Sequence, residues 1–155
     1  MRSGFSPRSV ALVFVLVAVL YFASFAGIEH LRHRKGPWVA GFGFTTNGEP
    51  SLTIAQARRG LADVRLVFHG EHTTNAAATV RFDTVLRPVP FGRVIYEDLT
   101  FLPGVVTFDL FGHEIELLPR ALIVNRRAVP WRNGMTVDLW PTNKPAIPPQ
   151  PPKRR

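Results

Sequence analysis

The chain has 155 residues and a net charge of +8. Its length is sufficient for one folded domain. Because it has no cysteine, disulfides, thiolate metal sites and cysteine nucleophiles are excluded. Its positive charge belongs to the two ends: residues 1–35 contain five bases and one acid, residues 36–140 contain ten of each, and residues 141–155 contain four bases and no acid. A domain that binds nucleic acid concentrates positive charge on its folded surface, so we expect no specific nucleic-acid partner.

The first predicted element is an uncharged apolar segment, residues 10–28, which follows a basic N-terminal tail of residues 1–9. As an α-helix it would be ~28 Å long, close to the ~30 Å hydrocarbon core of a bilayer. We therefore predict a single-pass transmembrane helix that acts as a signal-anchor. Its lipid-facing side chains include Val10, Phe14, Leu20, Phe25 and Ile28.

The alternative for this segment is a cleaved signal peptide. Ser24 and Ala26 form a small-x-small pattern, which would place the cleavage after Ala26 and give a secreted product. The bulky Tyr21, Phe22 and Phe25 near the end of the run favour the uncleaved anchor.

A basic linker, residues 29–36, follows the apolar segment. Arg32, Arg34 and Lys35 would lie at the level of the lipid headgroups, where they can contact anionic lipid. Arg2 and Arg8 precede the span, so the flanking charges are nearly balanced. A neutral domain can be translocated despite a few flanking charges, and we expect the domain to lie outside the cytoplasm.

Residues 37–140 contain short alternating apolar runs separated by turn residues, which is typical of a β-rich globular domain. The run at 38–44 places Trp38, Ala40, Phe42 and Phe44 on one face. The spacing of the runs predicts about eight or nine strands in an antiparallel β-sandwich or small barrel. A short helix over residues 53–61, closed by Gly60, is an alternative to one of them.

Turn residues predict how these strands connect. Asn47-Gly48 indicates a two-residue type I′ hairpin, and residues 125–127 indicate another short hairpin turn. The runs at 64–68 and 79–82 are predicted to pair with each other. Phe111 is poorly suited to a positive φ, so we expect a loop of more than two residues at 111–112.

Residues 141–155 form a proline-rich basic tail that we expect to be disordered and to sample polyproline II. Residues 148–153 match a Pro-x-x-Pro pattern followed by a base, which some aromatic grooves bind. A spacer is the simpler interpretation.

Four side chains are candidate metal ligands: His69, Glu71, His72 and His113. Zinc needs three or four such ligands in tetrahedral geometry. We favour a solvated loop without a bound metal as the interpretation of the first three. The His113-Glu114 pair lacks the second histidine of a metalloprotease helix, because position 117 is Leu117. On a strand, Glu114 and Glu116 would face water.

No catalytic motif and no cofactor motif is found in the sequence. The favoured hypothesis is a membrane-anchored, non-enzymatic β-domain that binds a protein partner or takes part in envelope assembly. The first alternative is a β-barrel that binds a small apolar molecule or lipid among its phenylalanines. The second is a metal-dependent hydrolase that uses the loop of His69 and His72.

Overall fold

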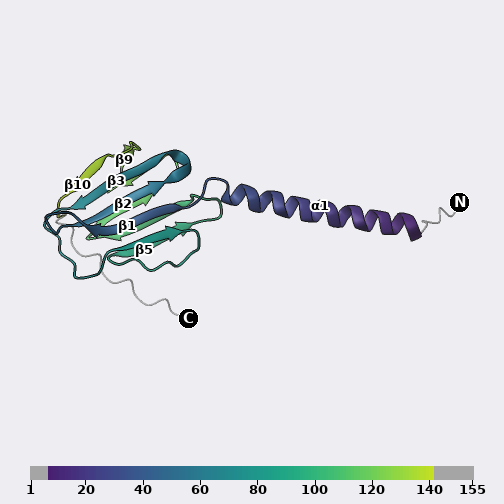
Figure 1. Cartoon of the computed structure of the whole chain (residues 1–155), viewed down its shortest axis with the longest axis horizontal. Coiled ribbons are helices and arrows are strands. Elements are labelled where there is room, and N and C mark those ends of the chain that lie inside the picture. Colours follow the sequence, from purple (N-terminus) through teal and green to yellow (C-terminus); the bar gives the residue numbers. More distant parts are fainter. Residues whose placement is uncertain (1–6, 142–155) are drawn as a thin grey trace.

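The computed structural model describes residues 7–141, which form one long helix attached to the end of a two-layered β-sandwich (Figure 1). Two five-stranded sheets make up the sandwich. The predicted β-sandwich is confirmed and the barrel alternative is wrong, because the two sheets share no strand pairing. There are ten strands among the described residues, not about eight. The proline-rich tail beyond Pro141 lies outside the described residues.

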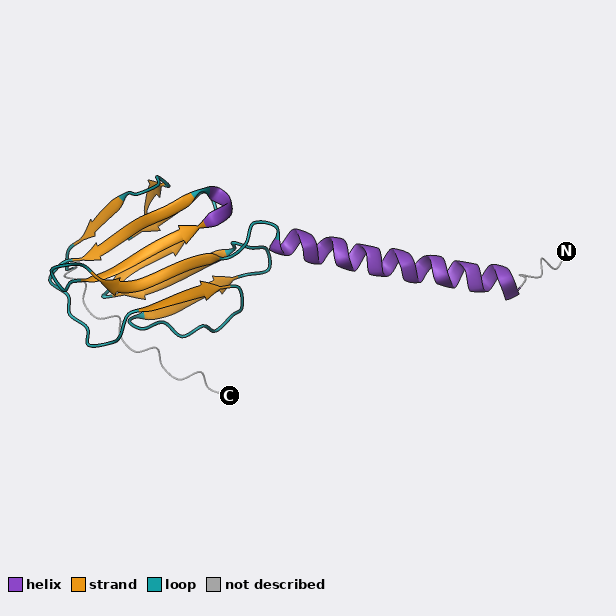
Figure 2. Ribbon diagram, in the orientation of Figure 1, coloured by secondary structure: helices purple, strands orange, loops and turns teal. Residues whose placement is uncertain are grey.

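Helix α1 spans Pro7–His33, which extends the predicted 10–28 at both ends. Proline suits the first turn because its missing N–H would be unpaired there. Gly36, at φ 72°, ends the helix by donating its N–H to the His33 carbonyl at 3.1 Å. The helix projects from the sandwich with no buried residue (Figure 2). It is long and apolar enough to cross a membrane.

The first sheet has the order β10-β3-β2-β1-β4 and is antiparallel except where β10 runs parallel to β3. Its strands are β1 (Trp38–Phe44), β2 (Pro50–Gln56), β3 (Leu61–Phe68), β4 (Ala78–Phe82) and β10 (Thr136–Leu139). The alternative helix over 53–61 reduces to one 3-10 turn, η1 (Ala57–Arg59), which Gly60 closes at φ 64°.

The predicted pairing of residues 64–68 with 79–82 is wrong. β3 pairs with β2 and β10, whereas β4 pairs with β1, where Phe82 lies opposite Trp38. The loop 69–77 is long enough to pass from β3 over the end of β2 and β1. Strand β4 can therefore pair with the outer edge of β1, whose backbone groups would otherwise be unpaired.

The second sheet is an antiparallel meander in the order β5-β6-β7-β8-β9. Its strands are β5 (Arg93–Asp98), β6 (Val105–Leu110), β7 (His113–Leu117), β8 (Ala121–Val124) and β9 (Arg127–Pro130). The short turn between β8 and β9 is as predicted, with Asn125 and Arg126 at φ 50° and 67°.

Two other turns differ from their predictions. The loop after β1 contains three residues, 46–48. It is closed by the Thr45 N–H, which donates to the Glu49 carbonyl at 2.8 Å. Among the loop residues only Gly48 has a positive φ, whereas a type I′ turn needs two. Conversely, residues 111–112 form a two-residue turn with Phe111 at φ 53°. The Phe111 ring packs against Phe68 and Phe91, at centroid distances of 5.2 and 5.4 Å, which offsets the strain.

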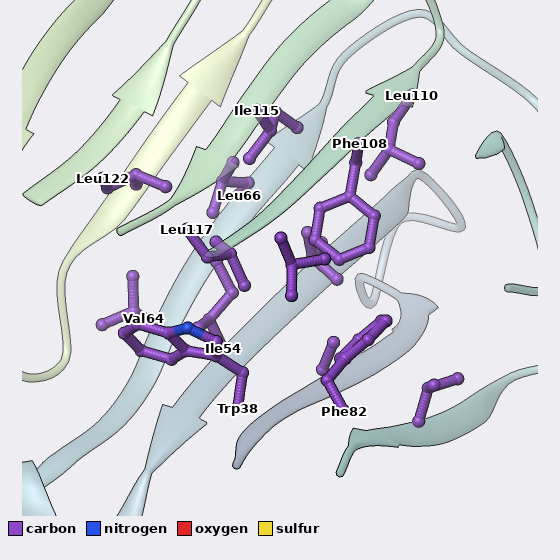
Figure 3. Close-up of a cluster of buried hydrophobic side chains, with 14 of the residues drawn as sticks. Trp38, Ile54, Val64, Leu66, Phe82, Phe108, Leu110, Ile115, Leu117 and Leu122 are labelled. Atoms are coloured by element: carbon purple, nitrogen blue, oxygen red, sulfur yellow. The ribbon is translucent and has the colours of Figure 1, made fainter. Parts of the chain in front are cut away.

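The inner faces of the sheets pack into one core (Figure 3). Phe82 meets Phe108 of the opposite sheet edge-to-face at a centroid distance of 5.4 Å. Trp38 is fully buried and donates its indole N–H across the core to the Gly104 carbonyl at 3.1 Å. Side chains therefore occupy the space in which a barrel would have held an apolar ligand.

Candidate functional site

A surface groove of about 490 Å³ lies beside strand β5, which is an edge strand of its sheet. We call it the β5 groove. One wall is the strand itself, and the other is part of the loop that runs from β4 to β5. Its lining residues are Leu86, Arg87, Pro88, Val89, Gly92, Arg93, Val94, Ile95, Tyr96 and Glu97.

The loop wall presents Leu86 in an unusual backbone conformation. Its φ is 62°, in the left-handed region that costs a leucine roughly 1–2 kcal/mol. The Leu86 N–H donates to Oε1 of Glu97 on β5, and this bond ties the loop to the strand. The leucine side chain is 89% exposed. A strained backbone that holds a large apolar side chain in water contributes nothing to the core.

The strand wall is also apolar. Ile95 and Tyr96 are 54% and 56% exposed, although they are consecutive residues of β5. Together with Leu86 they form a cluster of exposed apolar side chains that lines the groove. Clusters of this kind on a protein surface mark binding sites more often than isolated exposed residues do.

Strand β5 has one unpaired backbone edge, since among the described residues it pairs only with β6. An unpaired edge can accept an additional strand. The register shifts between Val94 and Tyr96, which bends the strand at this point. Arg93 on β5 forms an ion pair with Asp109 at 2.8 Å.

The polar group at the base of the groove is the Glu97 carboxylate. Its Oε1 accepts the Leu86 N–H, whereas its Oε2 is buried and has no hydrogen-bond partner among the described residues. Arg87 bonds to Asp83 and Thr84 instead.

The structure places His69 in a different setting from the predicted metal loop. Its Nδ1 lies 3.0 Å from a carboxylate oxygen of Glu49, its Nε2 lies 2.8 Å from Asp138, and its ring stacks on Trp140 at 4.4 Å. The hydrogen bonds to Asp138 and Glu49 raise the pKa of His69 above its ordinary 6.5. With both ring nitrogens used by carboxylates, His69 links the β1–β2 turn to β10.

The other candidate ligands are not brought together with His69. His113 is buried at the start of β7, where its Nδ1 lies 2.8 Å from the Asn125 amide. Glu71 and His72 lie in the loop after β3. Within residues 7–141 no group of three His, Asp or Glu side chains is arranged to hold a metal ion. Glu114 and Glu116 alternate with buried neighbours on β7, as expected.

The residues predicted to meet lipid lie on the free helix and at its end. The five lipid-facing candidates, Val10, Phe14, Leu20, Phe25 and Ile28, are between 54% and 77% exposed. Arg34 and Lys35 are exposed just beyond the helix. Arg32 has protein partners as well, because it donates to Glu29 and to the Thr100 carbonyl.

The sequence analysis did not identify the β5 groove. A signal for it exists in the pair Val85-Leu86, which is apolar yet lies in a proline-containing loop, where polar residues are usual. The exposure of Ile95 and Tyr96 depends on β5 being an edge strand, and strand order is not readable from the run itself. Comparisons with protein-family models, curated proteins and solved structures find no match for this chain.

Proposed function

We propose that the chain is a membrane-anchored, non-enzymatic module that binds a short extended segment of another protein in the β5 groove. The observation that carries the proposal is Leu86, which is strained, almost fully exposed and fixed to β5 through Glu97. The apolar walls and the unpaired strand edge suit an extended peptide, whose backbone pairs with the edge while alternate side chains enter the groove.

Anchoring is the second part of the proposal. Helix α1 is 27 residues long and has no buried residue, so its apolar surface needs a cover that the sandwich does not supply. A bilayer covers such a surface without any partner helix. We propose that the helix is an uncleaved single-pass anchor and that the sandwich lies outside the cytoplasm, where its partner is another protein of the cell envelope.

Site-specific photo-crosslinking in cells tests the groove. A photoreactive amino acid at Ile95, in the groove, is compared with one at Glu116, a partly exposed residue of β7 in the same sheet. The proposal expects a discrete adduct with one partner from Ile95, which mass spectrometry identifies as a short contiguous segment. The same adduct must be absent from Glu116 and lost when Leu86 is replaced by Asn. Equal adducts from both positions would contradict the proposal.

A further inference from the structure

The connection between the helix and the sandwich is held by specific contacts. The Leu102 N–H donates to the Arg32 carbonyl at 2.8 Å, and the Arg32 Nε donates to the Thr100 carbonyl at 2.9 Å. On the other sheet, the Gln56 amide donates to the carbonyls of Lys35 and Gly36. Both sheets are thus fixed to the helix end, and the same end of the sandwich always faces the helix (Figure 2).

Strand directions determine which turns lie at this end. β1 and β6 start here, since Trp38 follows the linker and its indole bonds to Gly104 just before β6. The antiparallel neighbours β2 and β7 therefore finish here, as does β5. We call this the proximal end. Its turns are residues 34–37, 57–60, 99–104, 118–120 and 131–135.

The charges of the two ends differ in sign. The proximal turns contain six bases and no acid. These bases, all exposed, are Arg34, Lys35, Arg58, Arg59, Arg120 and Arg132. The turns at the opposite end, 45–49, 69–77, 111–112 and 125–126, contain two acids and one base. Four of the six bases belong to residues 36–140, which as a whole are neutral, so the position of these four at the proximal end arises from the topology and not from composition.

The acids nearest to the proximal turns leave most of this charge uncompensated. Asp83 forms ion pairs with Arg81 and Arg87, outside the proximal set. Asp98 accepts the Thr100 N–H at 3.0 Å, which lowers the pKa of its carboxyl. Asp63, in β3, is the remaining exposed acid near this end. An apolar ring, Phe101, is 59% exposed among the basic turns.

We infer that the proximal end of the sandwich docks on the anionic headgroups of the membrane that α1 crosses. The helical part of the linker, residues 29–33, places Arg34 ~8 Å beyond the apolar span. Headgroup layers are roughly 5–7 Å thick, and the Debye length is ~8 Å at physiological ionic strength. The proximal bases therefore lie within reach of lipid charge, and Phe101 lies where aromatic side chains favour the interface.

In this arrangement residues of the folded domain contact the lipid headgroups in addition to those of the linker. Arg58 and Arg59 belong to η1, which the Gln56 side chain caps by accepting the Arg59 N–H at 2.9 Å. The same Gln56 holds the linker carbonyls. Gln56 thus connects the backbone of η1, which carries the two arginines, to the linker that carries Arg34 and Lys35. This inference rests on the proposed anchoring of the helix in a membrane.

Spin labelling of the full chain in lipid nanodiscs tests the docking. The chain has no cysteine, so Ala57→Cys gives one label in η1 and Ala76→Cys gives one at the opposite end. The readout is access of a water-soluble nickel reagent to the label. In discs that contain anionic lipid we expect label 57 to be protected relative to zwitterionic discs, and label 76 to be equally accessible in both.

Charge reversal identifies the residues responsible. Arg58→Glu with Arg59→Glu should abolish the protection of label 57, because each base near an anionic surface changes affinity roughly fivefold. The matched control, Arg126→Glu with Arg127→Glu at the opposite end, should leave it unchanged. Salt of ~1 M should also remove the protection of the unaltered chain, since it shortens the Debye length to ~3 Å.

Two results would overturn the inference. If the chain co-elutes with lipid but label 57 is equally accessible in both kinds of disc, docking is wrong while anchoring stands. If the chain does not co-elute with lipid at all, the anchoring fails and the docking fails with it.

Discussion

Leu86 combines two properties that a structural residue would not need: a left-handed backbone and a side chain in water. Asparagine tolerates this conformation better than leucine. We predict that Leu86→Asn raises the free energy of unfolding by up to about 1 kcal/mol and abolishes partner capture in the groove. Chemical denaturation and the Ile95 crosslink measure the two effects.

Leu86→Ala separates backbone strain from the side chain at this position. Alanine keeps the unfavourable φ but removes the apolar group, so stability should change by less than about 0.5 kcal/mol while crosslinking is lost. If either variant binds the partner as well as the natural chain, the leucine is not the anchor of the groove.

His69 makes stability depend on pH. Its pKa is raised by hydrogen bonds to Asp138 and Glu49, so protonated His69 is favoured in the folded state. The resulting stabilisation is complete below the ordinary pKa of 6.5 and is lost as the pH rises through the higher folded-state pKa. We predict that the difference in melting temperature between the natural chain and His69→Gln is larger at about pH 5.5 than at about pH 8.5.

The comparison with His69→Gln removes contributions from the other histidines, which both proteins share. A difference that is constant over this pH range would show that the contacts of His69 with Glu49 and Asp138 do not titrate as the structure indicates.

At the scale of elements, the junction of β5 and β6 depends on one glycine. Gly104 has a φ of 70°, and a Cβ there would collide with the backbone carbonyl of Asp98. Gly134 has a similar φ of 68° but no heavy atom near the corresponding position. We predict that Gly104→Ala lowers the free energy of unfolding by about 2–4 kcal/mol and Gly134→Ala by about 1 kcal/mol. Equal losses in denaturant unfolding would contradict this assignment.

Local pattern was sufficient for most strands and for some turns. The alternation of Trp38, Ala40 and Phe42 locates β1 and its buried face, and Asn125 locates the β8–β9 turn. Strand pairing was less predictable than strand location. β4 pairs with β1 and not with β3, and this choice depends on which strand of the assembled sheet still has an unpaired edge. The two-residue turn at Phe111 depends on packing against Phe68 and Phe91, which are distant in sequence.

The candidate site was less predictable than the fold for the same reason. Sequence reasoning singled out polar residues, such as His69 and Glu71, whereas the β5 groove is built from apolar side chains whose exposure arises only from the strand order. The pairing of His69 with Glu49 and Asp138 joins three segments that no local motif connects.

At the scale of the whole molecule, the chain consists of an uncovered apolar helix and a sandwich that packs its own core without it. The charge distribution agrees with this division, because the basic excess lies outside residues 36–140. We propose that the helix positions the domain at a membrane and that the sandwich binds the partner. Every proposal about partners depends on the helix residing in a membrane.

Alkaline extraction of cell membranes that contain the full chain tests this central claim most directly. Carbonate at high pH releases peripheral proteins and retains proteins whose helices cross the bilayer. The account predicts that the chain stays in the membrane pellet with residues 10–28 intact, as read by mass spectrometry of its N-terminal peptides. Recovery of the chain with its N-terminus uncleaved in the soluble fraction would contradict the account.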